Sequence, residues 1–536
     1  MAAKQALEFD YVIVGAGSAG CTLAGRLSEN RDVTVCLLEA GGSDDKAIIR
    51  TPMLLQNAMT TPAINWDYET VPQQHLNGRT LYWPRGKTLG GSSSINAMHY
   101  IRGARENYDE WAATYGAEGW SWEDCFPKFL AQQDQERGES DHHATGGPLR
   151  VQDIQPINPI SELFIQAAAE LQYPLNADFN GARQDGFGIY QVTQKGPRRW
   201  SAADAFLRPA LERENLTVIT DALTHRVRLD GKRATGVVAE IEGAPAEITA
   251  RKEVILSGGA INSPQLLLLS GIGPGQEIRG AGVTPEIDLP GVGKNLQDHL
   301  DVTGQIKMRS ARSIGRSWRA APKLIGDVLR WMIRGDGDFT VNPIQGGAFV
   351  KSSQSDGLPD LQLVFIPSLS APHGRETIYG HGATLHVCHL YPQSRGEIRL
   401  ASDDPRMYPL IDPNYLSAEE DLEALTDGLE IVRRVLNAPA FAEERVAELL
   451  PGDLKVTRDD LRDDIRARAE TLYHPTSTCA MGDGEMAVTD PRCRVRGVEG
   501  LRVVDASVMP RLVGGNTNAP TIMVAGRAAD MIAADA

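Results

Sequence analysis

The stretch DYVIVGAGSAG covers residues 10–20, and VTVCLLEAG follows at residues 33–41. The pattern predicts a buried strand, a glycine turn, a helix, and a second buried strand that ends in an acid. Each glycine has a physical reason. Gly15 permits the tight turn, Gly17 lets the backbone approach a pyrophosphate, and Gly20 lets the helix pack closely on the strand. The two runs together carry the βαβ fingerprint of dinucleotide-binding proteins.

Glu39 ends the second strand, 24 residues after Gly15. A carboxylate in this position can accept hydrogen bonds from ribose hydroxyls. The helix that starts after Gly17 presents free N–H groups and a partial positive charge to phosphates. A plain glycine turn in an α/β core would leave the position of Glu39 unexplained, so the sequence predicts a nucleotide-binding domain.

The bulk composition limits the classes of protein to which this chain can belong. Its 536 residues exceed one ordinary core, so we expect two or three domains. Hydrophobic content of 42% and charged content of 23% are typical of a soluble globular protein. A formal net charge of −16 argues against nucleic acid or an anionic membrane surface as the main partner.

The cysteines show neither a CxxC pair nor the Cys/His spacing of a metal site; they are Cys21, Cys36, Cys125, Cys388, Cys479 and Cys493. We therefore expect free thiols in a reducing compartment and no metal. The N-terminal residues lack the apolar core of a secretory signal, and no run of about 18 apolar residues occurs. These features predict a cytoplasmic protein, and they leave peripheral association with the cytoplasmic face of the inner membrane open.

Further apolar runs continue the nucleotide-binding domain. They are TVIT at 217–220, GVVAEI at 236–241, EVILSGGA at 253–260 and LRVVDAS at 501–507. A helix is expected after the third run, with Pro264 in its first turn.

Two intervening stretches have a different character and predict a second, interleaved domain. One is short and polar, and the other mixes strand patterns, as at 361–365, with an amphipathic helix over 421–436. A ligand cleft is expected where the domains meet. The predicted division gives 1–155, 196–300 and 461–536 to the nucleotide-binding domain, and 156–195 and 301–460 to the substrate domain.

Three polar motifs are candidates for chemistry. WPRGKTLGGSSSINAM at 83–98 gathers backbone N–H and hydroxyl donors, which suits phosphates or a flavin edge, although a serine-rich loop is the alternative. YHPTSTCAMG at 473–482 contains His474, whose backbone is stiffened by the following Pro475. GGNTNAPT at 514–521 precedes an apolar helix, where its asparagines can cap the helix or face a ligand.

In combination these motifs resemble the GMC (glucose–methanol–choline) oxidoreductases, FAD-dependent enzymes that oxidise alcohols. Within that family, the sequence as a whole is most similar to the choline-dehydrogenase-like branch, in particular to bacterial alcohol dehydrogenases that act on aliphatic alcohols. The matching runs extend over nearly the whole chain: GAGSAG with Glu39, RGKTLGGSSSINAM at 85–98, GAINSPQLL at 259–267, GVGKNLQDH at 291–299, the YHP…MG run at 473–482, and VDAS at 504–507 with NTN at 516–518.

The resemblance implies a fold and a mechanism. The fold is α/β, with a Rossmann-like FAD-binding domain interleaved with an α+β substrate domain built on an antiparallel sheet. His474 is then the base that takes the hydroxyl proton, and Asn518, 44 residues on, completes a pair with it and donates to the developing alkoxide. Tyr473 would wall the substrate pocket beside the base.

The resemblance also implies the residues that bind FAD. They come from the fingerprint, the serine-rich motif, the strand after residue 220 and the C-terminal motifs: Gly15, Gly17, Ser18, Ala19, Gly20, Glu39, Ala40, Arg85, Thr88, Gly90, Gly91, Ser92, Asn96, Ala97, Met98, Val227, Asp505, Ala506, Asn516 and Thr517.

The sequence departs from the family pattern at two positions. Members with covalent flavin carry a histidine just before the asparagine of the serine-rich motif, where this chain has Ile95, so we expect non-covalent FAD. Choline-oxidising members carry a glutamate in an ExGxF run. The matching residue here is Gln345, which cannot offset a buried cation, so a neutral primary alcohol, aliphatic or aryl, is favoured over choline.

Several alternatives remain open at the level of sequence. An oxidase would return electrons to O2 to form H2O2, whereas a dehydrogenase would use a quinone or other acceptor. A choline-type dehydrogenase, an FAD-containing lyase and a non-catalytic FAD- or NAD-binding protein are the further alternatives. The physiological alcohol, further oxidation of the aldehyde and the oligomeric state are not specified.

Overall fold

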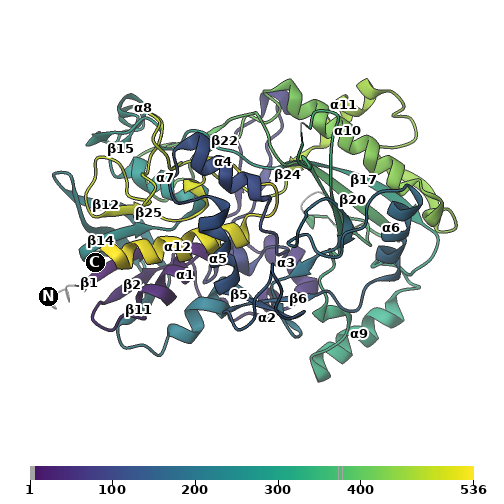
Figure 1. Ribbon diagram of the computed structural model, residues 1–536, viewed down its shortest axis with the longest axis horizontal. Helices are drawn as coiled ribbons and strands as arrows, with labels where there is room; N and C mark the ends of the chain where they lie inside the picture. Colours follow the sequence, from purple (N-terminus) through teal and green to yellow (C-terminus); the bar gives the residue numbers. More distant parts are fainter. Residues whose placement is uncertain (1–6, 356, 372–373, 377, 536) are drawn as a thin grey trace.

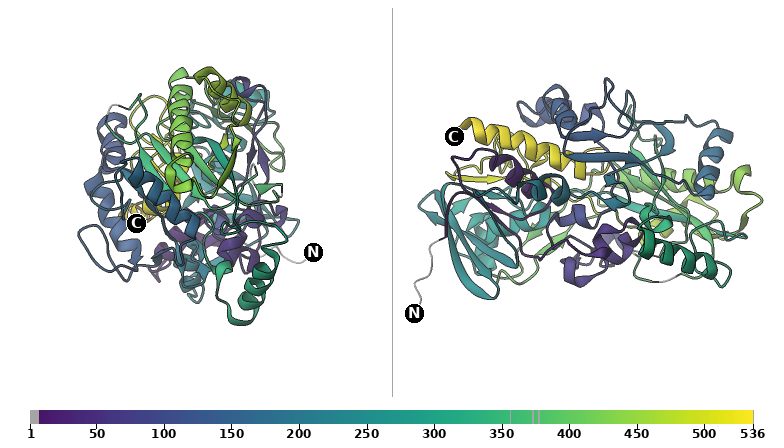
Figure 2. Two further views of the ribbon diagram at one scale, coloured as in Figure 1. Left: turned by 90° about the vertical axis from the view of Figure 1, so that its right-hand side faces the viewer. Right: turned by 90° about the horizontal axis from the view of Figure 1, so that it is seen from below.

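The computed structural model describes residues 7–355, 357–371, 374–376 and 378–535. Two seven-stranded sheets dominate an elongated molecule, one toward each end (Figure 1). The described parts of both chain ends lie at the end that holds the first sheet (Figures 1 and 2). Within the described ranges, no helix is both long enough and apolar enough to cross a bilayer.

The first sheet has a parallel half and an antiparallel half. β11, β2, β1, β14 and β25 pair in parallel, and β14, β13 and β12 form an antiparallel meander. The parallel strands are apolar on both faces because helices cover them. The strands are β1 (Leu7–Val14), β2 (Val35–Leu38), β11 (Leu216–Ile219), β12 (Ala222–Asp230), β13 (Arg233–Ile241), β14 (Ala244–Leu256) and β25 (Leu501–Val503).

The second sheet is antiparallel at every pairing. Its order is β23-β17-β20-β19-β18-β7, with β24 also on β17. The strands are β7 (Gly186–Ile189), β17 (Leu300–Met308), β18 (Gly346–Val350), β19 (Leu361–Ile366), β20 (Gly382–His389), β23 (Arg445–Leu450) and β24 (Glu470–Thr471). The predicted α/β architecture, a Rossmann-like sheet joined to an antiparallel one, is confirmed; the residue boundaries of the two domains stay a prediction.

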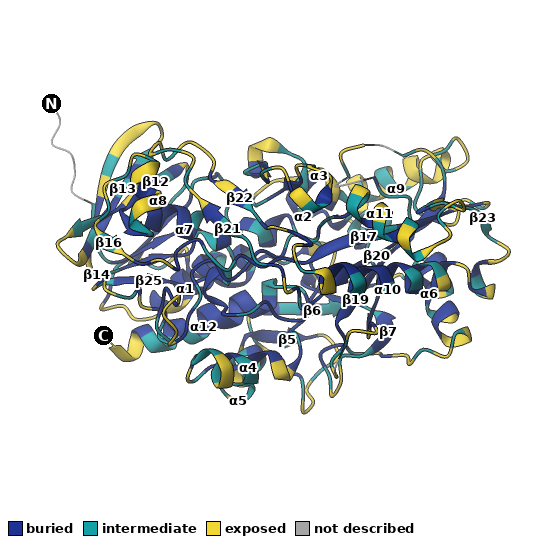
Figure 3. Cartoon of the chain, turned by 90° about the horizontal axis from the view of Figure 1, so that it is seen from above, coloured by how far each residue is buried: buried dark blue, intermediate teal, exposed yellow. Residues whose placement is uncertain are grey.

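Helices pack on both sheets, whose central strands are buried, whereas the meander β12–β14 and β23 keep exposed residues (Figure 3). α1 and α12 pack together beside the first sheet, and α10 lies across β17 and β20 of the second. The helices are α1 (Ser18–Leu27), α2 (Ala47–Arg50), α3 (Leu55–Met59), α4 (Arg105–Tyr115), α5 (Trp122–Gln132), α6 (Pro159–Glu170), α7 (Gly259–Leu269), α8 (Gly275–Gly280), α9 (Ala321–Arg334), α10 (Glu419–Leu436), α11 (Arg458–Arg468) and α12 (Asn518–Asp535).

One helix matches its sequence pattern and another differs in detail. The predicted apolar face of α10, from Leu422 to Leu436, is buried. Pro264 lies in the middle of α7 rather than in its first turn, which corrects the predicted start. A proline there leaves the carbonyl of Ala260 without its helical N–H partner. The hydroxyl of Thr478 donates to that carbonyl at 2.7 Å, so the tertiary fold compensates the lost bond.

Candidate active site

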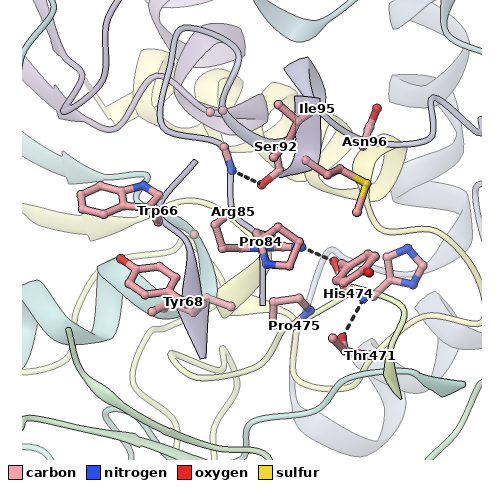
Figure 4. Close-up of a pocket in the computed structure, with 18 of the residues that line it drawn as sticks. Trp66, Tyr68, Pro84, Arg85, Ser92, Ile95, Asn96, Thr471, His474 and Pro475 are labelled. Atoms are coloured by element: carbon pink, nitrogen blue, oxygen red, sulfur yellow. Dashed lines mark hydrogen bonds between the residues drawn. The ribbon is translucent and has the colours of Figure 1, made fainter. Parts of the chain in front are cut away.

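A cavity of about 900 Å³ runs between the two sheets (Figure 4). Its walls come from segments far apart in the sequence: the turn between β1 and α1, the end of β2, residues 84–87 and 91–99, the start of α7, and the C-terminal motifs around 471–475 and 516–518. Predicted site residues that line it are Gly15, Gly17, Ser18, Ala19, Glu39, Ala40, Arg85, Gly91, Ser92, Asn96, Ala97, Met98, Tyr473, His474, Asp505, Ala506, Asn516, Thr517 and Asn518.

The glycine turn leaves a backbone surface open to the cavity. Gly15 has φ +98°, and a Cβ there would lie 2.6 Å from the carbonyl oxygen of Ser257. A Cβ on Gly91 would lie 2.7 Å from the Cα of Gly17, so the serine-rich motif packs directly on the turn. No side chain caps α1, and no acid lies in its first turn. This helix N-terminus therefore suits a phosphate group.

Glu39 is buried beside the same turn. Its carboxylate accepts hydrogen bonds from the backbone N–H of Ala16 at 2.8 Å and of Gly41 at 2.9 Å. Burial raises the pKa of Glu39 to about 7, and the two N–H groups oppose that rise. The carboxyl is thus held at the cavity wall, where a ribose hydroxyl can reach it.

The serine-rich motif is fixed to both sides of the cavity. Ser92 Oγ accepts from the N–H of Gly86 at 3.2 Å, and Arg85 donates to the carbonyl of Tyr473 at 2.7 Å (Figure 4). Asn96 Oδ1 accepts from the backbone N–H of Met98 at 3.0 Å. The N–H of Gly90 donates to the carbonyl of Ala16, so the motif joins the nucleotide-binding turn to the segment that carries His474.

The backbone of His474 is anchored by a buried carboxylate. Its N–H donates to Asp298 Oδ1 at 2.6 Å, and Asp298 Oδ2 accepts from the hydroxyls of Thr471 and Tyr415. Burial raises the pKa of Asp298 to about 6. Tyr473 has φ +69°, an uncommon conformation that turns the chain sharply before His474. Asp298 belongs to the GVGKNLQDH run, to which the sequence alone assigned no role.

His299, the next residue of that run, determines where His474 carries its proton. His299 Nε2 lies 3.1 Å from the carbonyl oxygen of Leu390, which can only accept, so His299 Nε2 carries the proton. His299 Nδ1 is then an acceptor, and it lies 2.9 Å from Nδ1 of His474. His474 therefore donates from Nδ1, and its Nε2 keeps a lone pair.

Hydrogen bonds on the other side of His474 lead to the same tautomer. Tyr190 donates its hydroxyl proton to the carbonyl of Leu363 at 2.7 Å, so its oxygen accepts from Gln362 Nε2 at 3.0 Å. Gln362 Nε2 also donates to Asn516 Oδ1 at 3.1 Å. The amide of Asn516 consequently turns its N–H groups toward His474 Nε2, at 3.1 Å.

Both imidazoles are held neutral. Burial lowers the pKa of His474 well below its ordinary value, and the neighbouring His299 and Arg85 lower it further. Burial lowers the pKa of His299 to about 3. His474 is therefore a cavity-lining residue with an unprotonated Nε2 that accepts an N–H from Asn516. A hydroxyl group that takes the place of that N–H can give its proton to Nε2.

The predicted pairing of His474 with Asn518 stays a prediction, because both residues line the cavity but the hydrogen bonds of Asn518 lead elsewhere. Asn518 is the first residue of α12, and its Oδ1 accepts from the hydroxyl of Ser18 at 2.7 Å, so it joins the nucleotide-binding turn. Asn516, predicted only as a cofactor residue, contacts His474 instead. The two asparagines are two residues apart in the same motif, and sequence spacing did not separate them.

Gln345 does not face the cavity, which corrects its predicted place in the substrate pocket. Its Oε1 accepts from the N–H of Asn158 at 2.8 Å and from the hydroxyl of Ser161 at 2.9 Å, at the start of α6. Gln345 directly precedes β18, and its neighbour Ile344 lines the cavity. Val364 of the adjacent strand lines it too.

Four predicted cofactor residues lie behind the cavity wall. Val227 is buried in the first core, whereas Thr224, earlier in β12, reaches the cavity. Thr88 donates to the carbonyl of Gly42 at 2.9 Å. The remaining two support the turn: the N–H of Gly90 donates to the carbonyl of Ala16, and a Cβ on Gly20 would lie 1.8 Å from the carbonyl oxygen of Gly15.

Three acidic residues line the outer parts of the cavity, and each is paired with a base. Asp301 contacts His386, Glu470 contacts Arg79, and Glu240 contacts Arg406. Glu470 and Glu240 are thus paired with arginines, whereas Asp301 is held by a hydrogen bond from a histidine. The other acidic residues among the described lining residues, Glu39 and Asp505, are held by hydrogen bonds to the nucleotide-binding elements.

Comparison with known proteins places the chain among characterised relatives. Two family models described as GMC oxidoreductase match residues 9–301 and 392–525. The chain is 47% identical to an alcohol dehydrogenase [acceptor] of Pseudomonas putida, over 98% of this chain and 95% of the relative. It is 42% identical to an oxygen-dependent choline dehydrogenase of Chromohalobacter salexigens, over 99% and 95%. A formate oxidase of Aspergillus oryzae, solved in a study of FAD modification, has a TM-score of 0.92 at 26% identity, over 99% of both chains.

Proposed function

This chain belongs to the GMC oxidoreductase family, and we propose that it uses FAD to oxidise a neutral primary alcohol to the aldehyde. The electrons then pass to a quinone or to another acceptor that is not oxygen. The observation that carries the proposal is the neutral His474, a cavity-lining residue whose Nε2 is unprotonated and accepts an N–H from Asn516. The name of the Pseudomonas putida relative, alcohol dehydrogenase [acceptor], supports an alcohol as substrate and the transfer of electrons to an acceptor.

The cavity fits FAD by its donor set. The open backbone at Gly17 and the uncapped N-terminus of α1 would hold the pyrophosphate, and Glu39 would accept from the ribose. Ser92 and Asn96 line the continuation of the cavity toward His474, where the flavin ring would lie. When bound, FAD takes up the hydride that leaves the alcohol carbon.

The protein residues handle the proton. His474 Nε2 would accept the hydroxyl proton, because its only proton is already committed to His299 through Nδ1. Asn516 would donate an N–H to the alcohol oxygen as negative charge develops there, the role that the sequence assigned to Asn518. His299 is a positioning residue in this scheme, because it acts through His474.

The cavity supports a neutral substrate rather than choline. Two of the three acids in its outer part are paired with arginines and the third, Asp301, is hydrogen-bonded to His386, so each carboxylate that could offset a trimethylammonium charge already has a partner. Ile344, Val364 and Ile366 give the substrate side an apolar wall that suits an aliphatic or aryl tail.

Non-covalent attachment of FAD is part of the proposal. Ile95, which stands where covalent members carry histidine, is 3% exposed and packs with Ile49, Ala58 and Ile64. An isoleucine has no nucleophilic atom to bond to the flavin. Acid precipitation of the holoenzyme is expected to leave the yellow colour in the supernatant, and colour that stays in the pellet would contradict this part of the proposal.

Replacement of the base tests the proposal. The variant His474→Ala is expected to lower kcat on a primary alcohol by at least about 100-fold, because a positioned base typically contributes about 10²–10⁴. The flavin absorbance of the purified variant serves as the control that FAD still binds. A variant that keeps its flavin and turns over near the wild-type rate would remove His474 from the mechanism.

A further inference from the structure

α9 is a surface helix that presents its apolar side chains to solvent. None of its 14 residues is buried. Ile325 is 61% exposed, Met332 70% and Ile333 79%, and these side chains share one face by helical spacing. Trp318, just before the helix, is 82% exposed. The helix projects from the body of the molecule near the second sheet (Figures 1 and 2).

The opposite face of α9 and the segment before it are basic. The helix carries Lys323, Arg330 and Arg334, and Arg316 and Arg319 precede it. Asp327 is the one acidic residue between positions 309 and 334. Lys323 contacts Asp327 and Asp338, and Arg330 contacts Asp336. Residues 309–338 still hold seven basic side chains against three acidic ones, in contrast to the formal net charge of −16 of the whole chain.

The basic amphipathic helix lies close to one opening of the cavity. The turn at Asp338–Thr340, just after α9, packs against Pro52–Leu54, which leads into α3. Gln56 of α3 is exposed and lines the cavity, and its amide donates to the hydroxyl of Ser370, another lining residue. The carbonyl of Arg316 accepts from the N–H of Gly380 at 3.0 Å, which fastens the basic segment to the same loop.

We propose that the apolar face of α9, together with Trp318, docks the protein on a bilayer surface that contains anionic lipid. A helix of 14 residues is too short to cross a hydrocarbon core of about 30 Å, but it can lie in the interface with its apolar face down. In that position the lysine and arginines of the polar face and of the preceding segment lie at the depth of the anionic headgroups. A protein partner would need an apolar surface surrounded by acidic residues and complementary in shape to the helix. A bilayer with anionic lipid offers an apolar interior and negative headgroups without any requirement for shape complementarity.

The net charge and the local charge have different consequences. The overall −16 repels an anionic surface at long range, so binding depends on apolar insertion as well as on the basic cluster. If the proposed function holds, docking brings the cavity opening toward the phase in which long-chain alcohols and quinones dissolve. The docking itself is tested without that assumption.

Co-sedimentation of the holoenzyme with vesicles, in the absence of alcohol, tests the docking. We expect binding to vesicles of phosphatidylcholine mixed with phosphatidylglycerol, weaker binding to phosphatidylcholine alone, and weakening with added salt. The variant Ile325→Ser/Met332→Ser/Ile333→Ser is expected to reduce partitioning at least about tenfold. The variant Arg319→Glu/Arg334→Glu should weaken binding to the mixed vesicles by about fivefold or more for each residue.

A matched control removes apolar surface elsewhere. Leu454 and Val456 are 90% and 77% exposed on a distant loop, and Leu454→Ser/Val456→Ser should bind vesicles like the wild type. Equal binding by the α9 triple variant and the wild type, or no wild-type binding to the mixed vesicles, would overturn the proposal. It would also be overturned if light scattering showed a wild-type dimer that the triple variant dissolves, without vesicle binding. Turnover with a soluble dye reports separately on the proposed function.

Discussion

At the scale of single residues, the direction of donation along one chain of hydrogen bonds determines the chemistry of the site. The carbonyls of Leu390 and Leu363 can only accept, and each fixes the direction of donation from its own end. The two directions meet at His474 and agree on a proton at Nδ1. A neutral imidazole that is also held in one tautomer needs no tautomer change before it accepts a proton.

Two substitutions of His299 test this assignment. His299→Asn keeps an oxygen acceptor near the position of Nδ1, so it should retain kcat within about tenfold of the wild type. His299→Gln keeps an N–H toward Leu390 but withdraws the acceptor from His474, so it should lose about 10–100-fold in kcat. A purely structural role would lower the melting temperature and activity of both variants alike, and that result would contradict the assignment.

The pH profile of the wild-type enzyme tests the neutral state of His474. Burial disfavours the protonated form of His474, so its pKa is lowered and the neutral base persists as the pH falls. The acidic limb of kcat/KM should therefore lie below pH 6.5, the ordinary pKa of histidine. An acidic limb at or above that value in the wild type would contradict the neutral state.

Sequence predicted the residues of the site better than their contacts. The YHP motif identified His474, because proline after a histidine restricts the backbone and the family resemblance supplied the role. It could not separate Asn516 from Asn518, since the choice depends on where α12 begins. It also assigned no role to His299, whose effect depends on a carbonyl 91 residues away along the chain.

At the scale of elements, the turn between β1 and α1 separates packing from binding within one motif. A Cβ on Gly17 would lie 3.9 Å from its nearest neighbour, the carbonyl oxygen of Ser257, which is an ordinary contact. A Cβ on Gly20 would lie 1.8 Å from the carbonyl oxygen of Gly15. Gly17 is thus needed for a ligand, and Gly20 for the fold.

Matched alanine variants distinguish these two roles. Gly17→Ala should fold with nearly unchanged stability but bind FAD at least about tenfold more weakly, a cost of about 1.4 kcal/mol. Gly20→Ala should lower the free energy of unfolding by about 1–3 kcal/mol or more, because the helix must move off the strand. Thermal unfolding of the apoprotein and FAD titration measure the two effects. A Gly17→Ala protein with wild-type FAD affinity would contradict the cradle.

Periodic elements were predictable and irregular ones were not. The heptad-like spacing of leucines specified α10 and its buried face, since tertiary packing only had to accept that face. α7 begins before Pro264 because the hydroxyl of Thr478, distant in sequence, replaces the missing helical bond. Gln345 precedes a strand, where the direction of a side chain depends on the exact start of the alternation.

At the scale of the molecule, the cavity exists because two sheets from interleaved segments meet. The parallel sheet contributes the nucleotide-binding turn, and the antiparallel sheet contributes the carbonyls that orient His474 through His299 and Asn516. Sequence predicted both sheets from the βαβ fingerprint and the alternating runs. It could not predict the protruding α9, in which Trp331 stacks on Phe339 while Ile325, Met332 and Ile333 stay exposed.

Anaerobic titration of the holoenzyme with 1-octanol, followed by the visible absorbance of the flavin, tests the central claim most directly. We predict that the oxidised flavin bands disappear without added acceptor, and that choline requires a much higher concentration for the same change. The account would be contradicted if the flavin absorbance stayed unchanged with every primary alcohol, or if choline bleached it more readily than octanol.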